Sequence, residues 1–248
     1  MSKVLLADPF ETSEFSIAWA KDHITELDRE IDTFLNDDDA RTIVTEPSVN
    51  GTYHLLKIKF LKPMPRPLRG HASDAAINLR NALDQAMFAV AGSHGYFPIR
   101  DSKSAFDDAM RDVSKRIPNE IADIVRNSEP YKGRNDLLWA LNRLVNTKKH
   151  GILRPVTSAN TLKIEGFALG ILFWNPPRWD SDKNEMILAR IPTGTNFDID
   201  LEATFFITFN EIESLDGKEV LTVLNEFVNI VEGIVMAIKA ESKRIGIF

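Results

Sequence analysis

The chain has 248 residues, a net charge of −6, 44% apolar and 27% charged residues, and no cysteine. This composition is typical of a soluble globular protein and excludes disorder, disulfides, cysteine-ligated zinc or iron–sulfur centres and thiol nucleophiles. The acidic balance also argues against a protein whose main task is to coat DNA, because such proteins are usually basic.

The N-terminus and the apolar segments bear on the compartment. The apolar run over residues 4–7 is shorter than the core of a secretory signal. No stretch approaches the roughly 20 consecutive apolar residues that a membrane-spanning helix needs. Together with the absence of cysteine, which suits a reducing compartment, these features predict a cytoplasmic protein that does not contact a membrane.

The first third of the chain predicts a helix followed by a hairpin. Apolar side chains recur at helical spacing over residues 15–34, and an acidic run then ends the helix. Residues 41–45 and 53–60 are predicted to be two strands, because Asn50-Gly51 between them tolerates the positive φ of a tight turn. Three prolines within residues 62–69 predict an extended connector.

The middle of the chain is predicted to be helical. A helix that begins at Ser73 or Asp74 and stops at Gly92 has a regular apolar face. Two shorter helices are predicted over residues 104–113 and 118–126, the second with Pro118 in its first turn. A further amphipathic helix is predicted over residues 135–150.

The last third changes to β-branched and aromatic runs and ends in a helix. Strands are predicted over residues 152–156, 161–165, 168–174, 185–190 and 201–209. The segment 173–179 interleaves aromatic and basic residues, which suits either a stacking platform for single strands or, as we favour, a strand end and loop. The helix from 218 to about 243 is apolar over a wide arc, as in a buried helix or an oligomer contact.

These elements predict an α+β fold. We expect one domain over residues 1–248, with a central helical bundle whose core covers about 70–150. A mostly antiparallel β-sheet would be built from the N-terminal hairpin, about 41–60, and from the C-terminal third, 152–209. The long C-terminal helix completes the fold.

Polar residues collect at the end of the helix predicted over 135–150. Arg143 and His150 are separated by about two turns, or about 10.5 Å of rise, so their side chains leave the helix in similar directions. Asn146 and Lys149 lie on the same part of the helix. These four residues are the candidate site. A structural alternative stays open, because cations in the last turn before Gly151 also complement the helix dipole.

A second polar stripe lies on the helix that precedes Gly92. Asn78, Asn81 and Gln85 share one face, and uncharged amides are less usual than Lys or Glu on a solvated face. If this helix packs antiparallel to the helix of Arg143, the amides would face the candidate site across a groove. We expect them, with Lys149, to bind substrate.

Four segments occur in an order and spacing that resemble a family of uncharacterised bacterial and phage-encoded proteins of similar length. They are Leu-Arg-Asn-Ala-Leu-Asp at 79–84, Phe-Pro-Ile at 97–99, Glu-Pro-Tyr at 129–131 and Leu-x-Asn-x-x-Lys-His at 144–150. The likeness covers roughly residues 70–155. It implies a shared fold, and the family carries no established activity.

Arg143, separated from His150 by six residues, is similar to the Arg-x4–6-His pattern of HEPN domains. These helical modules often act as metal-independent ribonucleases in bacterial defence and toxin systems. A polar residue commonly follows the arginine in that family, whereas Leu144 follows it here. The resemblance implies RNA as substrate or partner.

Metal-independent RNA cleavage needs a group that takes the 2′-OH proton and a cation that stabilises the phosphate. His150 could be the base, Arg143 could bind the phosphate oxygens bidentately, and Asn146 could orient the imidazole. This chemistry needs neither a metal nor a cofactor. The alternative is a non-catalytic interaction or ligand-binding module, and the sequence does not decide whether the protein is an enzyme. A homodimer through helical faces is also left open.

Overall fold

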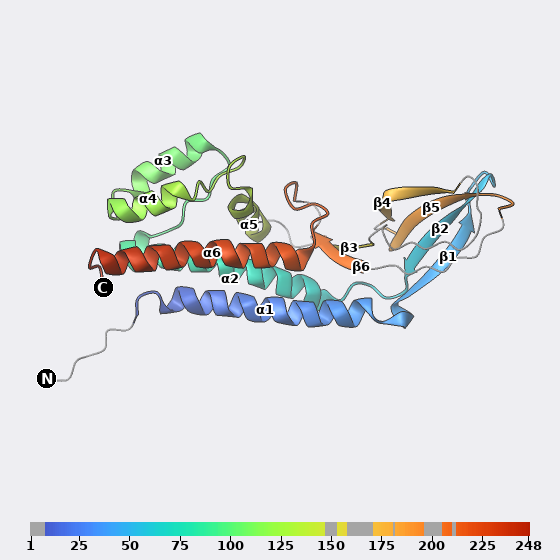
Figure 1. The fold of residues 1–248 in the computed structure, drawn as a ribbon, viewed down its shortest axis with the longest axis horizontal. Helices are drawn as coiled ribbons and strands as arrows, with labels where there is room; N and C mark the ends of the chain where they lie inside the picture. Colours follow the sequence, from blue (N-terminus) through green and yellow to red (C-terminus); the bar gives the residue numbers. More distant parts are fainter. Residues whose placement is uncertain (1–7, 147–152, 158–170, 181, 196–204, 210–211) are drawn as a thin grey trace.

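The computed structural model describes residues 8–146, 153–157, 171–180, 182–195, 205–209 and 212–248. Its architecture is α+β, as the sequence predicts: a bundle built on three long helices, with strands at one end (Figure 1). The helices are α1 (Glu11–Leu35), α2 (Arg66–Ala91), α3 (Lys103–Val113), α4 (Asn119–Asn127), α5 (Asp136–Asn146) and α6 (Val220–Arg244). The strands are β1 (Arg41–Pro47), β2 (Tyr53–Phe60), β3 (Leu153–Thr157), β4 (Leu172–Asp180), β5 (Glu185–Pro192) and β6 (Phe205–Phe209).

Helix α2 is central to the bundle, because it packs against α1, α6 and α5. Its buried face is rich in alanine, which lets neighbouring helices approach closely, and Leu79, Leu83 and Met87 supply the larger apolar side chains. Helix α1 runs antiparallel to α2 and α6 along most of the bundle's length (Figure 1). The helical core predicted from the apolar periodicity is therefore confirmed.

The start of α2 corrects the predicted extended connector. The helix begins at Arg66 rather than at Ser73 or Asp74, with Pro67 in its first turn, where a missing backbone N–H breaks no hydrogen bond. Leu68 is fully buried. Burial of Leu68 thus extends the helix upstream of Ser73 and Asp74, the two residues that the sequence offers as N-caps. The end of α2 is as predicted, since Gly92 has a φ of 72°.

Helix α6 corrects the expectation that no segment is long and apolar enough to cross a membrane. By length and composition it is apolar enough to cross a membrane, with a mean hydropathy of 1.6 in its most apolar stretch. In the structure, Leu224, Phe227, Val231 and Val235 are buried on the face of α6 that packs against the other helices. The wide apolar arc therefore belongs to the core of the bundle on this face.

The strands form two antiparallel sheets, one with the order β1-β2-β5-β4 and one that pairs β3 with β6. The predicted strand 161–165 and residues 168–170 lie outside the described residues. β4 continues through the segment 173–179, which corrects the expected strand end and loop. It tolerates Pro176 and Pro177 because it is an edge strand, and its register shifts between Phe173 and Arg178.

The four-stranded sheet contains a network of four charges. Lys57 Nζ on β2 lies 2.6 Å from Glu46 Oε2 on β1 and 2.9 Å from Glu185 Oε2 on β5. Lys59 pairs with the same two carboxylates. The side chains of Lys57 and Glu185 are only 8% and 9% exposed. Each of these two buried charges therefore needs an oppositely charged partner. Hydrogen bonds from Lys57 and Lys59 lower the pKa of Glu46 from 4.5 to about 2.

This network predicts a loss of stability in acid. The folded-state pKa of Glu46 is depressed, so its contribution is complete above about pH 4.5 and disappears as the pH falls towards about 2. We expect about 1 kcal/mol from this carboxyl, because it is 38% exposed and water screens its ion pairs. Urea unfolding at pH 7 and pH 3 should therefore show a smaller acid-induced loss in Glu46→Gln than in the wild type. Asp108→Asn, in an exposed pair on α3, should leave the loss unchanged.

Candidate functional site

A polar network fixes α5 against α2, and Arg80 is its centre. The guanidinium donates from Nε to Asn142 Oδ1 on α5, at 3.2 Å, and from Nη2 to the Phe97 carbonyl, at 3.0 Å. It also forms an ion pair with Asp84, one turn further along α2, at 2.6 Å. Asp84 in turn accepts a hydrogen bond from the Phe97 backbone N–H, at 2.8 Å. We call these four residues the Arg80 network.

The sequence spacing of Arg80 and Asp84 does not by itself indicate the Arg80 network. Arg80 and Asp84 have the spacing of an ordinary surface ion pair on a helix, yet the Arg80 side chain is only 14% exposed and reaches two other segments. The available signal was the resemblance, because two of its segments, 79–84 and 97–99, contribute residues to the network. Arg100, which follows the segment 97–99, donates its backbone N–H to the carbonyl of Pro130 in the segment 129–131, at 3.0 Å.

Helix α5 is positioned at both ends of its described length. Asn135, just before the helix, accepts a hydrogen bond from the Leu138 N–H at 3.2 Å and so caps the first turn. Trp139 is buried and donates from its indole Nε1 to Asp101 Oδ1, at 2.7 Å. Near the other end, Asn142 is held by Arg80. The polar side chains that follow Asn142 therefore project from a fixed helix.

The exposed side of α5 carries cations beside the Trp139 ring. The Arg143 guanidinium carbon lies 5.8 Å from the ring centre, and Lys132 Nζ, from the loop before the helix, lies 4.9 Å from it. Both distances are within the range of cation–π attraction. Lys132 also pairs with Glu213 at 2.9 Å. This arrangement gives Arg143 a defined position at the surface.

The structure places two of the four candidate residues of this helix. Arg143 and Asn146 are exposed on the last described turns of α5. The side-chain amide of Asn146 donates to the Asn142 carbonyl at 2.8 Å, a bond internal to the helix. Lys149 and His150 lie outside the described residues.

The amide stripe of α2 does not face α5 as expected. Gln85 Oε1 accepts a hydrogen bond from Ser16 Oγ on α1, at 2.9 Å, and so points to the opposite neighbour. Asn78 donates to the Asp74 carbonyl within its own helix, and Asn81 is exposed. The reason is the direction in which each side chain leaves α2: Arg80, rather than an amide of the stripe, makes the hydrogen bond to α5.

Gln85 instead borders a pocket of about 300 Å³ on the α1 side, lined also by Thr12, Phe15, Ser16 and Trp19. Phe15 and Trp19 are more than half exposed. The pocket is therefore a shallow aromatic surface with one amide.

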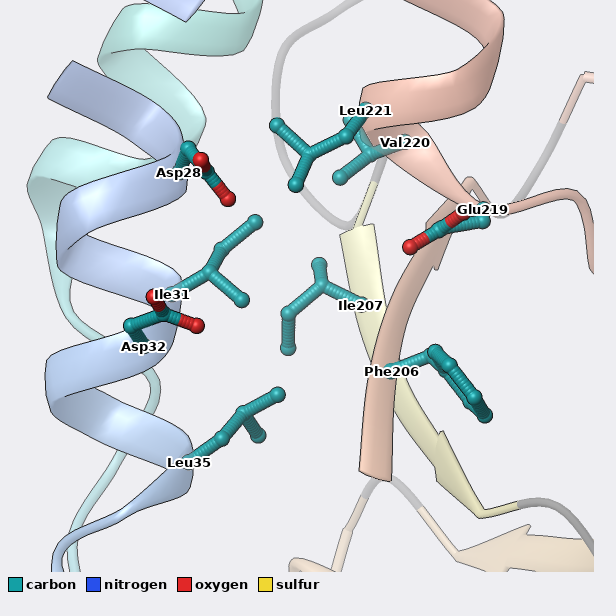
Figure 2. Close-up of a pocket in the computed structure, with 9 residues that line it drawn as sticks. All are labelled: Asp28, Ile31, Asp32, Leu35, Phe206, Ile207, Glu219, Val220 and Leu221. Carbon is teal, nitrogen blue, oxygen red and sulfur yellow. The ribbon is translucent and has the colours of Figure 1, made fainter. Parts of the chain in front are cut away.

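Figure 2 shows a second pocket, between α1 and the start of α6, with a volume of about 210 Å³. Ile31 and Leu35 of α1 face Ile207 of β6 across it, whereas Phe206 points away, as alternation along a strand requires. Among the described residues, its lining includes Asp28, Asp32 and Glu219 and no basic side chain, so this pocket is acidic as well as apolar.

Among the described residues, no group of three or more His, Asp or Glu side chains is arranged to hold a metal ion. Comparison of the chain with protein-family models, with curated proteins and with solved structures found no match. The resemblances based on the four segments and on the Arg143/His150 spacing therefore stay predictions.

The Arg80 network predicts a measurable loss on mutation. Arg80→Ala removes two hydrogen bonds and an ion pair at a largely buried position, while alanine suits the helix itself. We expect the free energy of unfolding to fall by about 2–4 kcal/mol. Arg111→Ala, which removes an exposed ion pair on α3, should change it by no more than about 0.5 kcal/mol. Urea unfolding followed by circular dichroism compares the two, and equal losses would contradict the role given to Arg80.

Proposed function

We propose that the protein cleaves RNA without a metal, in the manner of HEPN domains, at a site formed by Arg143, Asn146 and His150. The observation that supports this proposal is the position of Arg143. Arg143 is exposed on a helix that the Arg80 network and Trp139 hold in place, so the backbone that carries it is fixed relative to the fold.

The reaction is a transesterification. The 2′-oxygen attacks the adjacent phosphorus while His150 takes its proton, and the bond from phosphorus to the 5′-oxygen breaks. Arg143 neutralises the charge that builds up on the non-bridging oxygens, and Asn146 orients the imidazole or a substrate hydroxyl. The products are a 2′,3′-cyclic phosphate and a free 5′-hydroxyl once that oxygen gains a proton.

Electrostatics favour the α5 surface as the place where RNA approaches. Arg143 and Lys132 flank the Trp139 ring there, and together they would contact neighbouring phosphates. Lys149, close in sequence to Arg143, would add a further cation. Lys132 is paired with Glu213 at 2.9 Å, so a phosphate would have to displace this carboxylate from it.

A second candidate function is a non-catalytic interaction or ligand-binding module. It is favoured by the hydrogen bonds of the two asparagines: Asn146 is bonded within its own helix, and Asn142 is bonded to Arg80. In this alternative both amides are structural, and Arg143 contributes only surface charge. The two candidates differ in whether RNA is broken.

Cleavage of a mixed-sequence RNA pool by the purified protein, with EDTA present throughout, tests the proposal. We expect Arg143→Ala and His150→Ala each to reduce the rate by about 10²–10³-fold, because each removes one catalytic group. Arg111→Ala removes an exposed arginine from another helix and should cleave like the wild type. Product fragments should end in a 2′,3′-cyclic phosphate.

Two results would overturn the enzyme. An RNA pool left intact by the wild type would favour the interaction module. Equal cleavage by the wild type and both variants would assign the activity to a contaminant.

A further inference from the structure

Two histidines from different helices meet on the side of α2 that faces α1. His23 lies in the middle of α1 and His71 in the second turn of α2. Their Nδ1 atoms are 3.1 Å apart, and their ring centres are 5.4 Å apart. Both side chains are half-buried. This pair plays no part in the proposed RNA site.

Few arrangements allow two imidazole nitrogens to lie this close together. Two imidazole Nδ1 atoms at this distance must have something between them, because two lone pairs or two N–H groups would repel. One possibility is a single shared proton. The other is a metal ion, since two nitrogen ligands of tetrahedral zinc, each about 2.0–2.1 Å from the metal, are about 3.3 Å apart. The observed separation is within a few tenths of an ångström of that value.

A carboxylate lies behind His71. Glu30 Oε1, two turns after His23 on α1, lies 3.9 Å from His71 Nε2, on the side of the ring away from His23. Its other oxygen, Oε2, is buried and has no hydrogen-bond partner in the described part of the chain. Histidines that bind metals commonly donate their second ring N–H to a carboxylate, which fixes the tautomer and orients the ring. Closure of the 3.9 Å gap between Glu30 Oε1 and His71 Nε2 to hydrogen-bond distance would give this arrangement.

We propose that His23 and His71 form a binding site for a late first-row divalent cation such as Zn²⁺, with Glu30 orienting His71. Because no third His, Asp or Glu among the described residues completes a metal-binding group, two protein nitrogens would hold the ion and water would fill the other positions. Imidazole ligands select Zn²⁺, Cu²⁺ or Ni²⁺ over Mg²⁺ and Ca²⁺, which prefer oxygen. A bound ion would join α1 to α2 across the most extensive helix contact of the bundle.

Calorimetric titration of the full-length, tag-free protein with zinc chloride, in the absence of RNA, tests the site. The wild type should bind one equivalent, and His23→Ala or His71→Ala should each weaken binding at least tenfold. Glu30→Gln, which keeps the shape of the side chain, should weaken it about tenfold, as loss of an orienting carboxylate does elsewhere. His94→Ala, at an exposed histidine beyond the end of α2, should bind like the wild type.

Two further measurements separate the site from trivial causes. Circular dichroism and the metal-free Tm establish that each variant is folded. Electron paramagnetic resonance of the Cu²⁺ form should show coupling to two imidazole nitrogens in the wild type and to at most one in each alanine variant. The proposal is overturned if the wild type shows no saturable binding, which would leave a shared proton between the rings, or if His23→Ala and His71→Ala bind zinc as tightly as the wild type. Since zinc binding is measured without RNA, its failure is distinct from failure of the ribonuclease.

Discussion

The fold depends on the burial of α2 against three neighbours at once. A helix in this position can leave few polar groups unpaired, because water does not reach most of its surface. The alanines of α2 let α1 and α6 pack closely, and its longer apolar side chains fill the space between the helices. Three polar side chains at the borders of this helix, those of His71, Arg80 and Gln85, are paired with a neighbouring segment.

This constraint explains why the polar features of the bundle occur where α2 meets other elements. Arg80 joins α2 to α5 and to the Phe97 backbone, Gln85 joins it to Ser16 of α1, and His71 meets His23. Each contact fixes the position of a helix relative to α2. The surface that we propose for RNA is therefore positioned by contacts that do not themselves take part in catalysis.

The four-stranded sheet follows the same rule, that a buried polar group needs a partner, with charged side chains in place of amides. Lys57 and Glu185 are almost inaccessible to water, and each has opposite charges on the adjacent strands. Removing Lys57 would leave the carboxylate of Glu185, which is only 9% exposed, with Lys59 as its remaining partner at 3.3 Å. The network ties β1, β2 and β5 together through side chains in addition to their backbone ladders.

The sequence by itself determined the elements, because local periodicity and turn chemistry decide them. The helix that becomes α1, the hairpin with Gly51 at positive φ, the stop of α2 at Gly92 and the long C-terminal helix were all predictable. The α+β class follows from them. The start of α2 was not predictable locally, because Pro67 fits the first turn of the helix and Leu68 is buried only in the folded bundle.

Only the tertiary structure decided which polar residues meet. Arg80 and Asp84 look like a surface ion pair in the sequence, and the amide stripe looks like the face of a groove. In the folded bundle Arg80 bonds to α5, whereas Gln85 of the amide stripe bonds to α1. A residue's partner depends on which neighbouring helix covers its side of α2. The pairing of His23 with His71, 48 residues apart, has no sequence signal for the same reason.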